Sequence, residues 1–493
     1  MSIMKLKSGT DIRGTAIGEN TNLTDEAVKK ITAGFVRVTE NKTGLSPCEM
    51  TVAVGHDSRL SAERIRKAVV TVLCHYGIKV LDCALASTPA MFMTTVTAGC
   101  TASIQITASH HPYDKNGLKF FTKDGGFEDE DIVDILTFAE NADVSDIEAE
   151  DNSIKTDYMS EYAGILRKMI CDGINADNYE KPLDGLHIVT DAGNGAGGFY
   201  ATDVLEKLGA DITGSLYLDP DGSFPNHAPN PENAQAMESI SNAVISSGAD
   251  FGVIFDTDVD RSACVDSSGK EINRNALIAL AAAIALQDNP GGTIVTDSVT
   301  SDGLKYFIEN VLGGKHLRFK RGYKNVINEA LRLNSLGINT PLAMETSGHA
   351  ALRENYFLDD GAYLITKIII MLVKLRKEGK TIADLIADLP LPLEEKEIRF
   401  RILENDFREY GQKVIDDFTV YASDREGWTV ADDNHEGLRV SLDKEHGDGW
   451  MLLRMSVHDP ILPFNAESNS EGGVEKIISE FNRFICNYDK IEC

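Results

Sequence analysis

Short strand-like runs, each followed by a polar loop and then by a helix signal, recur along most of the chain. In the first part these runs occupy residues 50–54, 79–83 and 102–106, and in the second part residues 186–190 and 249–255. Strands that alternate with helices are typical of an α/β layer structure. The pattern therefore predicts successive α/β units.

A third set follows, with strand-like runs at residues 292–296, 316–320 and 342–344. From Leu393 onward apolar and polar residues alternate, which is typical of antiparallel strands, and residues 473–486 have helical spacing. A chain of 493 residues is also too long for a single core. We predict three successive α/β/α sandwich domains and a smaller C-terminal α+β domain, over residues 1–153, 154–272, 273–389 and 390–493.

The composition describes a globular protein with a strong acidic bias. Hydrophobic residues make up 42% of the chain, and the mean hydropathy of −0.17 is ordinary for a protein that folds in water. The formal net charge is −29, so the surface field would repel nucleic acids and anionic membranes. We therefore expect no nucleic-acid or membrane partner. An anionic substrate would need locally concentrated Arg, Lys, metal or helix N-termini.

Cysteine usage and the first residues indicate an intracellular location. The eight cysteines show no C-x-x-C pair and no metal-like spacing, so we expect them to be reduced and mostly buried. The first residues lack the apolar core of a signal peptide. The longest apolar run, residues 276–286, is too short to span a bilayer and is predicted to form a buried helix. We expect a cytoplasmic protein.

A polar loop after residues 102–106 places several reactive side chains close together in the sequence. It contains Ser109 and His110, and Lys119 follows beyond an Asn-Gly pair that we predict to form a turn. A serine, an imidazole and an amine can serve as a nucleophile, an acid or base, and a cation. Serine–histidine pairs in loops are more often turn or capping residues, so both interpretations stay open on this loop alone.

Three carboxylates alternate along the loop that follows residues 249–255. They are Asp256, Asp258 and Asp260, and Arg261 comes next. So many acidic groups after a buried strand are costly unless a cation neutralises them, and hard oxygen ligands suit Mg²⁺. A calcium-binding EF-hand is disfavoured, because its sixth loop position would be Arg261 instead of glycine. Two alternatives to the metal site stay open: a solvent-exposed acidic loop, and a haloacid-dehalogenase-type phosphatase, whose Asp-x-Asp also follows a strand.

Two groups of cations stand out in so acidic a chain. Lys320, Arg321 and Lys324 precede or begin a predicted helix, where a phosphate could meet the helix N-terminus; a solvated helix start is equally compatible. The second group combines a cation, a hydroxyl and an imidazole in one turn, a pattern that fits a phosphate clamp. Its members are Arg454, Ser456 and His458.

Three further features have both a structural and a functional interpretation. The stretch from Gly193 to Gly198 fits the G-x-G-x-x-G pattern of a dinucleotide site, but we favour a tight strand-to-helix turn because the pattern is common by chance. Arg13 lies in a glycine-flanked loop and would by default be a solvated surface residue. His349 alone would more often be a structural histidine.

Taken together and in this order, the loops resemble those of the α-D-phosphohexomutase superfamily, which includes phosphoglucomutases, phosphomannomutases and phosphoglucosamine mutases. Residues 107–112 (Thr-Ala-Ser-His-His-Pro) resemble its phosphoserine loop, with His111 in place of the usual asparagine. Residues 256–261 (Asp-Thr-Asp-Val-Asp-Arg) resemble its metal loop, and residues 345–349 (Glu-Thr-Ser-Gly-His) its sugar-recognition loop. With residues 454–460 as a phosphate loop, the resemblance spans nearly the whole chain.

The resemblance implies three α/β/α domains and a smaller C-terminal domain around one central cleft, with the glycine-rich stretch as a structural element. It also implies a phosphohexomutase that interconverts hexose 1-phosphate and hexose 6-phosphate, of glucose, mannose or both, through a phosphoserine enzyme and a sugar 1,6-bisphosphate. The substrate would be a small-molecule sugar phosphate, the cofactor one Mg²⁺ per chain, and the activator hexose 1,6-bisphosphate. No oligomeric state is indicated.

By this resemblance, Ser109 would carry the phosphoryl group and would bind the metal together with the aspartates. Lys119 would be the general base and acid, with His349 as the second choice. Arg13 and Arg261 would stabilise the transferring charge. The catalytic residues expected are Ser109, Lys119, His110, Arg13, Arg261 and His349, and the metal ligands are Ser109, Asp256, Asp258 and Asp260.

The resemblance also implies substrate contacts on several loops. Glu345 and Ser347 would bind sugar hydroxyls, Gly322 with its two following residues would sense sugar orientation, and Arg454 with Ser456 would hold the phosphate that is not transferred. The substrate-binding residues expected are Glu345, Ser347, Gly322, Tyr323, Lys324, Arg454, Ser456 and His458.

The phosphate loop departs from the family's common Arg-Pro-Ser-Gly-Thr-Glu-Pro. The replacements are Met455 for proline, Val457 for glycine, His458 for threonine and Asp459 for glutamate. Val457 cannot take the positive φ of glycine cheaply, so we expect a different loop path and an altered phosphate affinity. Two alternatives follow: a hexose 1,6-bisphosphate synthase with the same phosphoserine chemistry, and a catalytically silent relative that binds sugar phosphate.

Overall fold

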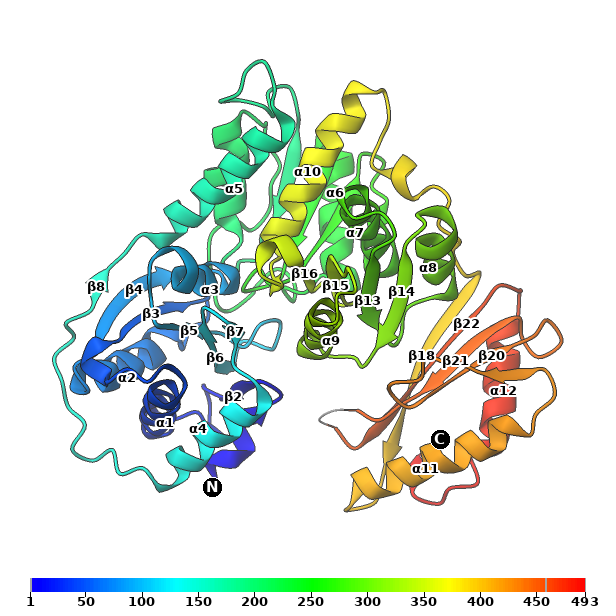
Figure 1. The fold of residues 1–493 in the computed structure, drawn as a ribbon, viewed down its shortest axis with the longest axis horizontal. Helices are drawn as coiled ribbons and strands as arrows, with labels where there is room; N and C mark the ends of the chain where they lie inside the picture. Colours follow the sequence, from blue (N-terminus) through cyan, green and yellow to red (C-terminus); the bar gives the residue numbers. More distant parts are fainter. Residues whose placement is uncertain (1, 457–458, 493) are drawn as a thin grey trace. The chain divides into compact units, whose positions relative to one another are not determined.

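The structure, a computed structural model, describes residues 2–456 and 459–492 (Figure 1). Contacts divide the chain into two units. Unit 1 comprises Met1–Leu277 and Ser347–Asp384, and unit 2 comprises Ile278–Thr346 and Leu385–Cys493. Each unit contains sheets and helices of its own.

The first sheet of unit 1 consists of β1 (Lys7–Ser8), β2 (Asp11–Thr15), β3 (Thr51–His56), β4 (Lys79–Leu85), β5 (Ala102–Ile106), β6 (Lys115–Thr122), β7 (Gly125–Gly126) and β8 (Ile154–Lys155). The order is β1-β2-β6-β5-β3-β4-β8, with β7 paired to β6. Strand β3 runs parallel to β4 and β5, whereas β6 runs antiparallel to β5 and β2. Asn116 and Gly117 lie inside β6, where they pair with β2, so the predicted turn at this Asn-Gly pair is wrong.

The helices of this part are α1 (Asp25–Thr43), α2 (Ala62–His75), α3 (Thr88–Thr97) and α4 (Asp129–Asn141). Helices α1, α2 and α4 share one hydrophobic core with the sheet. Phe120 of β6 stacks on Phe35 of α1 with ring centroids 5.0 Å apart, whereas the neighbouring Phe121 contacts Phe92 of α3 at 6.1 Å. Since successive side chains of a strand point to opposite faces, helices cover both faces, and Lys119 shares the face of α3.

Capping residues in the sequence set the starts of two of these helices. The Thr24 side chain accepts the N–H of Ala27 before α1, and the Ser87 side chain accepts the N–H of Ala90 before α3. Helix α3 begins with Thr-Pro. Proline is favourable there because it has no N–H group, and N–H groups in the first turn have no partner within the helix. The Thr-Pro pair at residues 88–89 is a helix-start signal in the sequence, and α3 begins there.

The second sheet of unit 1 consists of β9 (Ile188–Asp191), β10 (Phe251–Phe255), β11 (Ser262–Asp266) and β12 (Glu271–Ile272), in the order β12-β11-β10-β9. Unit 1 also contains α5 (Tyr158–Ile174), the π-helical turn η3 (Tyr200–Leu205), α6 (Ala234–Ser247) and α10 (Gly361–Lys377). In the same unit, β16 (Ala350–Leu352) pairs antiparallel with β17 (Leu358–Asp359). Strand β9 is parallel to β10. Strands β10 and β11 form an antiparallel hairpin, which encloses residues 256–261.

In unit 2, β13 (Thr293–Asp297) runs parallel to both β14 (Lys315–Phe319) and β15 (Leu342–Met344). The helical segments of this part are α8 (Asp302–Tyr306), the π-helical turn η5 (Phe307–Val311), α9 (Tyr323–Ser335) and α7 (Arg274–Asp288), which starts in unit 1. The Ser301 side chain accepts the N–H of Leu304, and α8 begins at Asp302, directly after Ser301.

The C-terminal part of unit 2 is an antiparallel sheet with both of its helices on one face (Figure 1). The elements are β18 (Glu394–Ile402), α11 (Phe407–Ser423), β19 (Trp428–Val430), β20 (Leu438–Leu442), β21 (Gly449–Leu453), β22 (Ile461–Ser468), α12 (Gly473–Ile485) and β23 (Ile491–Glu492). The strand order is β19-β20-β21-β22-β18-β23. The sequence pattern predicts β18, β20, β21 and α12, but it does not predict α11 or β22.

The opposite face of this sheet contacts the loop that follows β13. Trp450 of β21 packs on Val299 of that loop. The Arg439 guanidinium lies 3.5 Å from the centroid of the Trp450 ring and donates to the carbonyl oxygens of Ser298 (3.2 Å) and Thr300 (3.0 Å). Within unit 2, these contacts fix the C-terminal sheet to the end of β13.

The most apolar helices are internal to the fold. Residues Leu277 to Leu286 of α7 are buried, so the predicted buried helix is confirmed. Within the described ranges, no helix combines the length and the apolar character that a membrane crossing requires.

Candidate active site

Ser109 lies in the loop that leaves β5. Its backbone adopts φ +49°, a left-handed conformation that residues other than glycine rarely take. The Ser109 N–H donates to Thr107 Oγ1 (2.8 Å), and the Thr107 hydroxyl donates to Asp57 Oδ2 (2.7 Å). The Thr107 hydroxyl therefore stabilises the turn that presents Ser109.

Arg59 holds the backbone of the same loop. Its guanidinium is fully buried, and Nε donates to Asp57 Oδ2 (3.1 Å). The rigid fork of arginine donors suits several acceptors at once. Its two Nη atoms donate to the carbonyl oxygens of Ser109, His111, Pro112 and Lys115. One buried side chain thus fixes the path of most of the loop.

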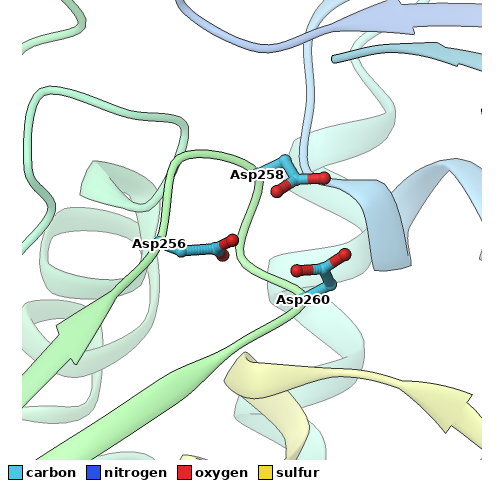
Figure 2. Close-up of side chains that lie close together, drawn as sticks. All are labelled: Asp256, Asp258 and Asp260. Atoms are coloured by element: carbon cyan, nitrogen blue, oxygen red, sulfur yellow. The ribbon is translucent and has the colours of Figure 1, made fainter. Parts of the chain in front are cut away.

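The hairpin loop between β10 and β11 brings three carboxylates together, and Figure 2 shows their side chains converging. One oxygen from each of Asp256, Asp258 and Asp260 lies within 4.8 Å of the others, and all three residues are buried. Val259 has φ +68°, and its carbonyl oxygen accepts the N–H of Gly361 (3.0 Å) at the start of α10. This backbone turn places the aspartates on either side of Val259 around one space.

The glycine-rich stretch at residues 193–198 packs against this loop. A Cβ at Gly195 would lie 2.6 Å from the carbonyl oxygen of Thr257, and the N–H of Ala196 donates to the same oxygen (2.8 Å). Glycine is required where two backbones approach so closely. These contacts support the interpretation of the stretch as a structural turn.

The two loops meet at the Ser109 hydroxyl. Ser109 Oγ donates to Asp256 Oδ2 (2.9 Å) and accepts from Arg261 Nη2 (3.1 Å). Arg261 also donates to Asp256 Oδ2 from Nε (3.1 Å) and Nη2 (3.0 Å). The hydroxyl therefore lies between a carboxylate that accepts its proton and a cation that can balance negative charge on its oxygen.

Lys119 of β6 contacts the other two carboxylates. Its Nζ donates to Asp258 Oδ2 (3.1 Å) and to Asp260 Oδ2 (2.5 Å). The hydroxyl of Thr88, at the start of α3, also donates to Asp258 Oδ2 (2.5 Å). The amine is buried among these acids and is part of the same cluster as the Ser109 hydroxyl.

The electrostatics of the cluster fit a divalent cation. Burial, together with the charges of Asp260 and Asp258, raises the pKa of Asp256 well above its usual range. Burial alone would raise the pKa of Asp260, but the Lys119 amine and His349 hold that pKa well below its usual range. Among the described residues, Asp258 Oδ1 and Asp260 Oδ1 are buried and accept no hydrogen bond. Buried carboxylate oxygens without a donor are suited to bind Mg²⁺, so the three aspartates could hold the metal.

His110 and His111 lie beside the hydroxyl. His110 Nδ1 is 3.4 Å from Ser109 Oγ, and the rings of His110 and His111 stack with centroids 5.0 Å apart. Burial and the charge of Arg261 lower the pKa of His110 far below its usual range. His110 is therefore a neutral imidazole at pH 7.

Arg13 lies on β2 next to this loop. It pairs with Gly117 of β6, and its Nη2 donates to Asp11 Oδ2 (2.7 Å). Burial and the charge of Arg13 lower the pKa of His111 to about 4. The structure therefore places Arg13 close enough to act on the charges around the serine loop.

His349 and Ser347 reach the cluster from the segment before β16. His349 Nε2 is 3.6 Å from Asp260 Oδ1, and its Nδ1 is 3.0 Å from Ser347 Oγ. A backbone bridge joins His349 to Arg261. A Cβ at Gly348, which has φ +96°, would lie 2.8 Å from the carbonyl oxygen of Ser262. The hairpin of β10 and β11 thus holds this segment directly.

In unit 2, Glu345 contacts the loop before α9. Its Oε1 accepts the N–H of Gly322 (2.6 Å), and the Glu345 side chain is buried. Gly322 has φ +117° and directly precedes α9, so Tyr323 and Lys324 lie in the first helical turn. The structure therefore brings together two of the loops that the sequence predicts to bind sugar.

Arg454 and Ser456 lie where β21 leads into β22. The N–H of Arg454 donates to the carbonyl oxygen of Pro463 (3.1 Å), and Ser456 continues this pairing. The Arg454 side chain is 8% exposed, and burial lowers its pKa. The expected residue His458, and Val457 beside it, lie outside the described residues.

Three residues that support the site were not among the predicted site residues. Asp57 and Arg59 lie in a Gly-His-Asp-Ser-Arg signature whose role the sequence does not reveal, and Thr88 has only a helix-start signal. Thr88 contacts a residue 170 positions away. No local pattern signals such a contact.

Comparisons with known proteins identify the family of the chain. Three models described as phosphoglucomutase/phosphomannomutase, alpha/beta/alpha domains I, II and III, match residues 4–143, 167–269 and 273–392. A phosphoglucomutase/phosphomannomutase of Thermococcus kodakarensis is 30% identical over 472 residues, which are 95% of each chain. A phosphomannomutase/phosphoglucomutase of Pseudomonas putida is 29% identical over 446 residues, which are 89% of this chain and 88% of the relative.

The fold is also similar to a solved structure. A phosphoglucomutase/phosphomannomutase family protein from Burkholderia thailandensis matches with a TM-score of 0.80 at 25% identity, over 99% of this chain and 98% of that one. The predicted fold class, three α/β/α domains followed by a smaller C-terminal domain, is confirmed. The chain belongs to the phosphoglucomutase/phosphomannomutase family.

Proposed function

We propose that the protein is a phosphohexomutase, an intramolecular phosphotransferase that interconverts hexose 1-phosphate and hexose 6-phosphate of glucose, mannose or both. The observation that carries the proposal is the contact of Ser109 Oγ with Asp256 Oδ2 (2.9 Å) and Arg261 Nη2 (3.1 Å). The names of the relatives from Thermococcus and Pseudomonas support the substrate class.

The proposed reaction has two phosphoryl transfers. The phosphoryl group on Ser109 Oγ passes to the free hydroxyl of the sugar phosphate: the bond from phosphorus to the serine oxygen breaks, and a bond to the sugar oxygen forms. The sugar 1,6-bisphosphate then turns round and returns its other phosphoryl group to Ser109. For phosphoryl transfer, the protein mainly has to position the reactants and stabilise their charge. The site suits this chemistry, because it has several cationic side chains and a serine loop whose backbone is held in place.

The other side chains of the site have separate proposed roles. Lys119 is the proposed acid and base for the sugar hydroxyl, with His349 as the second candidate, and Arg261 and Arg13 stabilise the negative charge of the group in flight. His110, a neutral imidazole next to Ser109 Oγ, orients the nucleophile. When bound, Mg²⁺ on Ser109, Asp256, Asp258 and Asp260 would neutralise the carboxylates and polarise the phosphoryl oxygens.

The proposed substrate contacts come from several loops. Glu345 and Ser347 bind sugar hydroxyls, the start of α9 at Gly322, Tyr323 and Lys324 senses the sugar's orientation, and Arg454 with Ser456 holds the second phosphate. His458 in this clamp stays a prediction, as do the bounds of the four domains, the central cleft, hexose 1,6-bisphosphate as activator and a cytoplasmic location.

The contacts of Asp256 favour Ser109 over this carboxylate as the phosphoryl acceptor. Asp256 Oδ2 already accepts hydrogen bonds from Ser109 and Arg261. Burial beside two further acids raises the pKa of Asp256 well above its usual range. The phosphatase alternative, with Asp256 as nucleophile, has less support.

The test compares the wild type with Ser109→Ala and with Ser145→Ala, a control in the exposed loop after α4. Each protein receives Mg²⁺ and catalytic glucose 1,6-bisphosphate with glucose 1-phosphate or mannose 1-phosphate, and hexose 6-phosphate is followed. Intact-protein mass spectrometry reports bound phosphoryl groups. We expect turnover and one phosphoryl group in the wild type and the control, and neither in Ser109→Ala. Unchanged turnover in Ser109→Ala would refute the scheme.

A second candidate is a hexose 1,6-bisphosphate synthase that uses the same phosphoserine. The substitution of Met455 for proline beside Arg454 favours it, since a weakened clamp would release the intermediate. With a phosphoryl donor present, a synthase accumulates bisphosphate far above the enzyme concentration, whereas a mutase does not. A silent sugar-phosphate-binding relative would show binding without either product.

A further inference from the structure

Glu436 in unit 2 sits at the meeting point of three segments. It lies in the loop between β19 and β20, and its side chain is 13% exposed. Its Oε2 accepts hydrogen bonds from Ser298 Oγ (2.6 Å) and from the backbone N–H of Arg321 (3.0 Å). Its Oε1 lies 3.9 Å from Arg454 Nη1. A single carboxylate therefore joins the loop after β13, the loop before α9 and the proposed phosphate clamp.

Arg454 depends on this carboxylate for its charge balance. Its side chain is 8% exposed, and within the described residues its buried Nε has no hydrogen-bond partner. Nη1 donates weakly to the carbonyl oxygen of Met455 (3.4 Å). Burial lowers the pKa of Arg454, and among nearby groups the charge of Glu436 opposes this most. The 3.9 Å between Arg454 Nη1 and Glu436 Oε1 is longer than a hydrogen bond, so Arg454 has unused capacity to bind an anion.

The donors around Glu436 are those that a phosphate would use. A hydroxyl, a backbone N–H next to a helix N-terminus and a guanidinium all bind phosphate oxygens as readily as carboxylate oxygens. The backbone next to Glu436 lies against the backbone at Arg454. A Cβ at Gly437, which has φ +60°, would lie 2.1 Å from the carbonyl oxygen of Leu453 and 2.7 Å from Arg454 Cα. The glycine therefore keeps the Glu436 loop in backbone contact with the clamp.

We propose that Glu436 is an affinity-determining residue, an internal carboxylate that pairs with Arg454 in the free protein and competes with the substrate's phosphate for it. The inference rests on the proposed function, because it takes Arg454 as the phosphate clamp. A phosphate dianion that reaches Arg454 meets a like charge a few ångströms away, so Glu436 weakens binding. The hydrogen bonds to Ser298 and Arg321 keep the carboxylate in place and link the clamp to the loop that begins α9.

A purely structural role makes a different prediction. In Glu436→Gln the amide oxygen can still accept from Ser298 Oγ and the Arg321 N–H, so a residue that only ties the segments together would leave phosphate affinity unchanged. Loss of the charge matters only if Glu436 competes for Arg454. Glu404→Gln is the matched control, because it removes one partly exposed carboxylate from the same C-terminal part of the chain.

The experiment measures the Kd of inorganic phosphate by calorimetry on the full chain in a chelator, so that a bound metal does not contribute. We expect Glu436→Gln to bind phosphate roughly three- to tenfold more tightly than the wild type, with Glu404→Gln unchanged. An unchanged or weaker Kd, or no binding to any of the proteins, overturns the proposal.

Two further measurements assign the effect to Arg454. The gain must vanish when Arg454→Met is combined with Glu436→Gln; if it persists in a folded double variant, the proposal is wrong. With glucose 1-phosphate and Mg²⁺, Glu436→Gln should lower KM by a similar factor and leave kcat within about twofold of the wild type. A wild type without turnover would refute the mutase, but the phosphate affinities would still decide the role of Glu436.

Discussion

At the scale of single residues, Val259 holds the carboxylate loop in a conformation that a β-branched side chain rarely adopts. Its φ of +68° costs on the order of 1–2 kcal/mol. The contact with α10 offsets this strain, because the Gly361 N–H donates to the Val259 carbonyl oxygen. A Cβ at Gly361 would lie 2.8 Å from the carbonyl carbon and oxygen of Arg261, so only glycine fits. Residue 361 therefore controls how Asp258 and Asp260 converge.

We predict that Gly361→Ala lowers both stability and Mg²⁺ affinity. The added methyl group must push the loop away from α10, which should cost about 1–3 kcal/mol in the free energy of unfolding. Thermal unfolding with a chelator and with increasing Mg²⁺ measures both effects. The control is Gly164→Ala in α5, where the nearest atom to the new Cβ is Arg167 Nη2 at 3.6 Å. Wild-type Mg²⁺ affinity in Gly361→Ala would contradict the role of the α10 contact.

At the scale of secondary-structure elements, Asp191 joins the end of β9 to its neighbours. Its carboxylate accepts from His227 Nε2 (3.0 Å), from Ser239 Oγ on α6 (3.0 Å) and from the N–H of Gly193 (2.9 Å). Burial alone would lower the pKa of His227, but the hydrogen bond and charge of Asp191 raise it above its usual value. The imidazolium–carboxylate pair therefore contributes to stability only while His227 is protonated.

The expected pH dependence follows from the raised pKa. The contribution is fully present below the unfolded-state pKa of 6.5 and is lost as the pH rises through the higher folded-state value. The difference in unfolding free energy between the wild type and His227→Gln should thus shrink as the pH rises above about 6.5. Urea unfolding across this range measures it, with His75→Gln as a control. A difference that does not change with pH would show that His227 acts only through packing.

The sequence pattern predicts those helices and strands that have a clear local signal. Strands β5 and β15 have the predicted bounds, because each is a short strand-like run between polar loops. Helix α11 was not predicted: Gly411 and several β-branched and aromatic residues lower its local helix propensity. Tertiary packing stabilises it instead, with Phe418 and Phe481 of α12 in edge contact at 5.1 Å.

At the scale of the whole molecule, the candidate metal ligands all belong to unit 1, whereas the C-terminal core lies in unit 2. A ligand stabilises the part of a protein that binds it, by roughly 2.7 kcal/mol at a concentration of 100 Kd. The two units should therefore respond differently to Mg²⁺.

We predict that Mg²⁺ slows amide hydrogen exchange around residues 107–111 and 256–261 and leaves the core of α11 and α12 unaffected. Mass spectrometry of exchanged peptides, with and without a chelator, measures this. Asp258→Asn, which removes one ligand charge, should lose most of the protection. Equal protection of the C-terminal core would mean that metal binding stabilises the chain as a whole.

The sequence by itself determined the α/β/α domains and the loops that carry Ser109 and the three aspartates. Hydrophobic periodicity and the order of strand, loop and helix are local properties of the sequence. Each site loop is one continuous segment after a strand, so its reactive residues can be recognised in the sequence. Only the tertiary structure decided what those loops contact. Three contacts join residues far apart in the chain. Arg59 donates to four carbonyl oxygens of the serine loop, and Thr88 donates to Asp258. Glu436 contacts both Arg321 and Arg454. Such contacts depend on the path of the folded backbone, which no local pattern encodes.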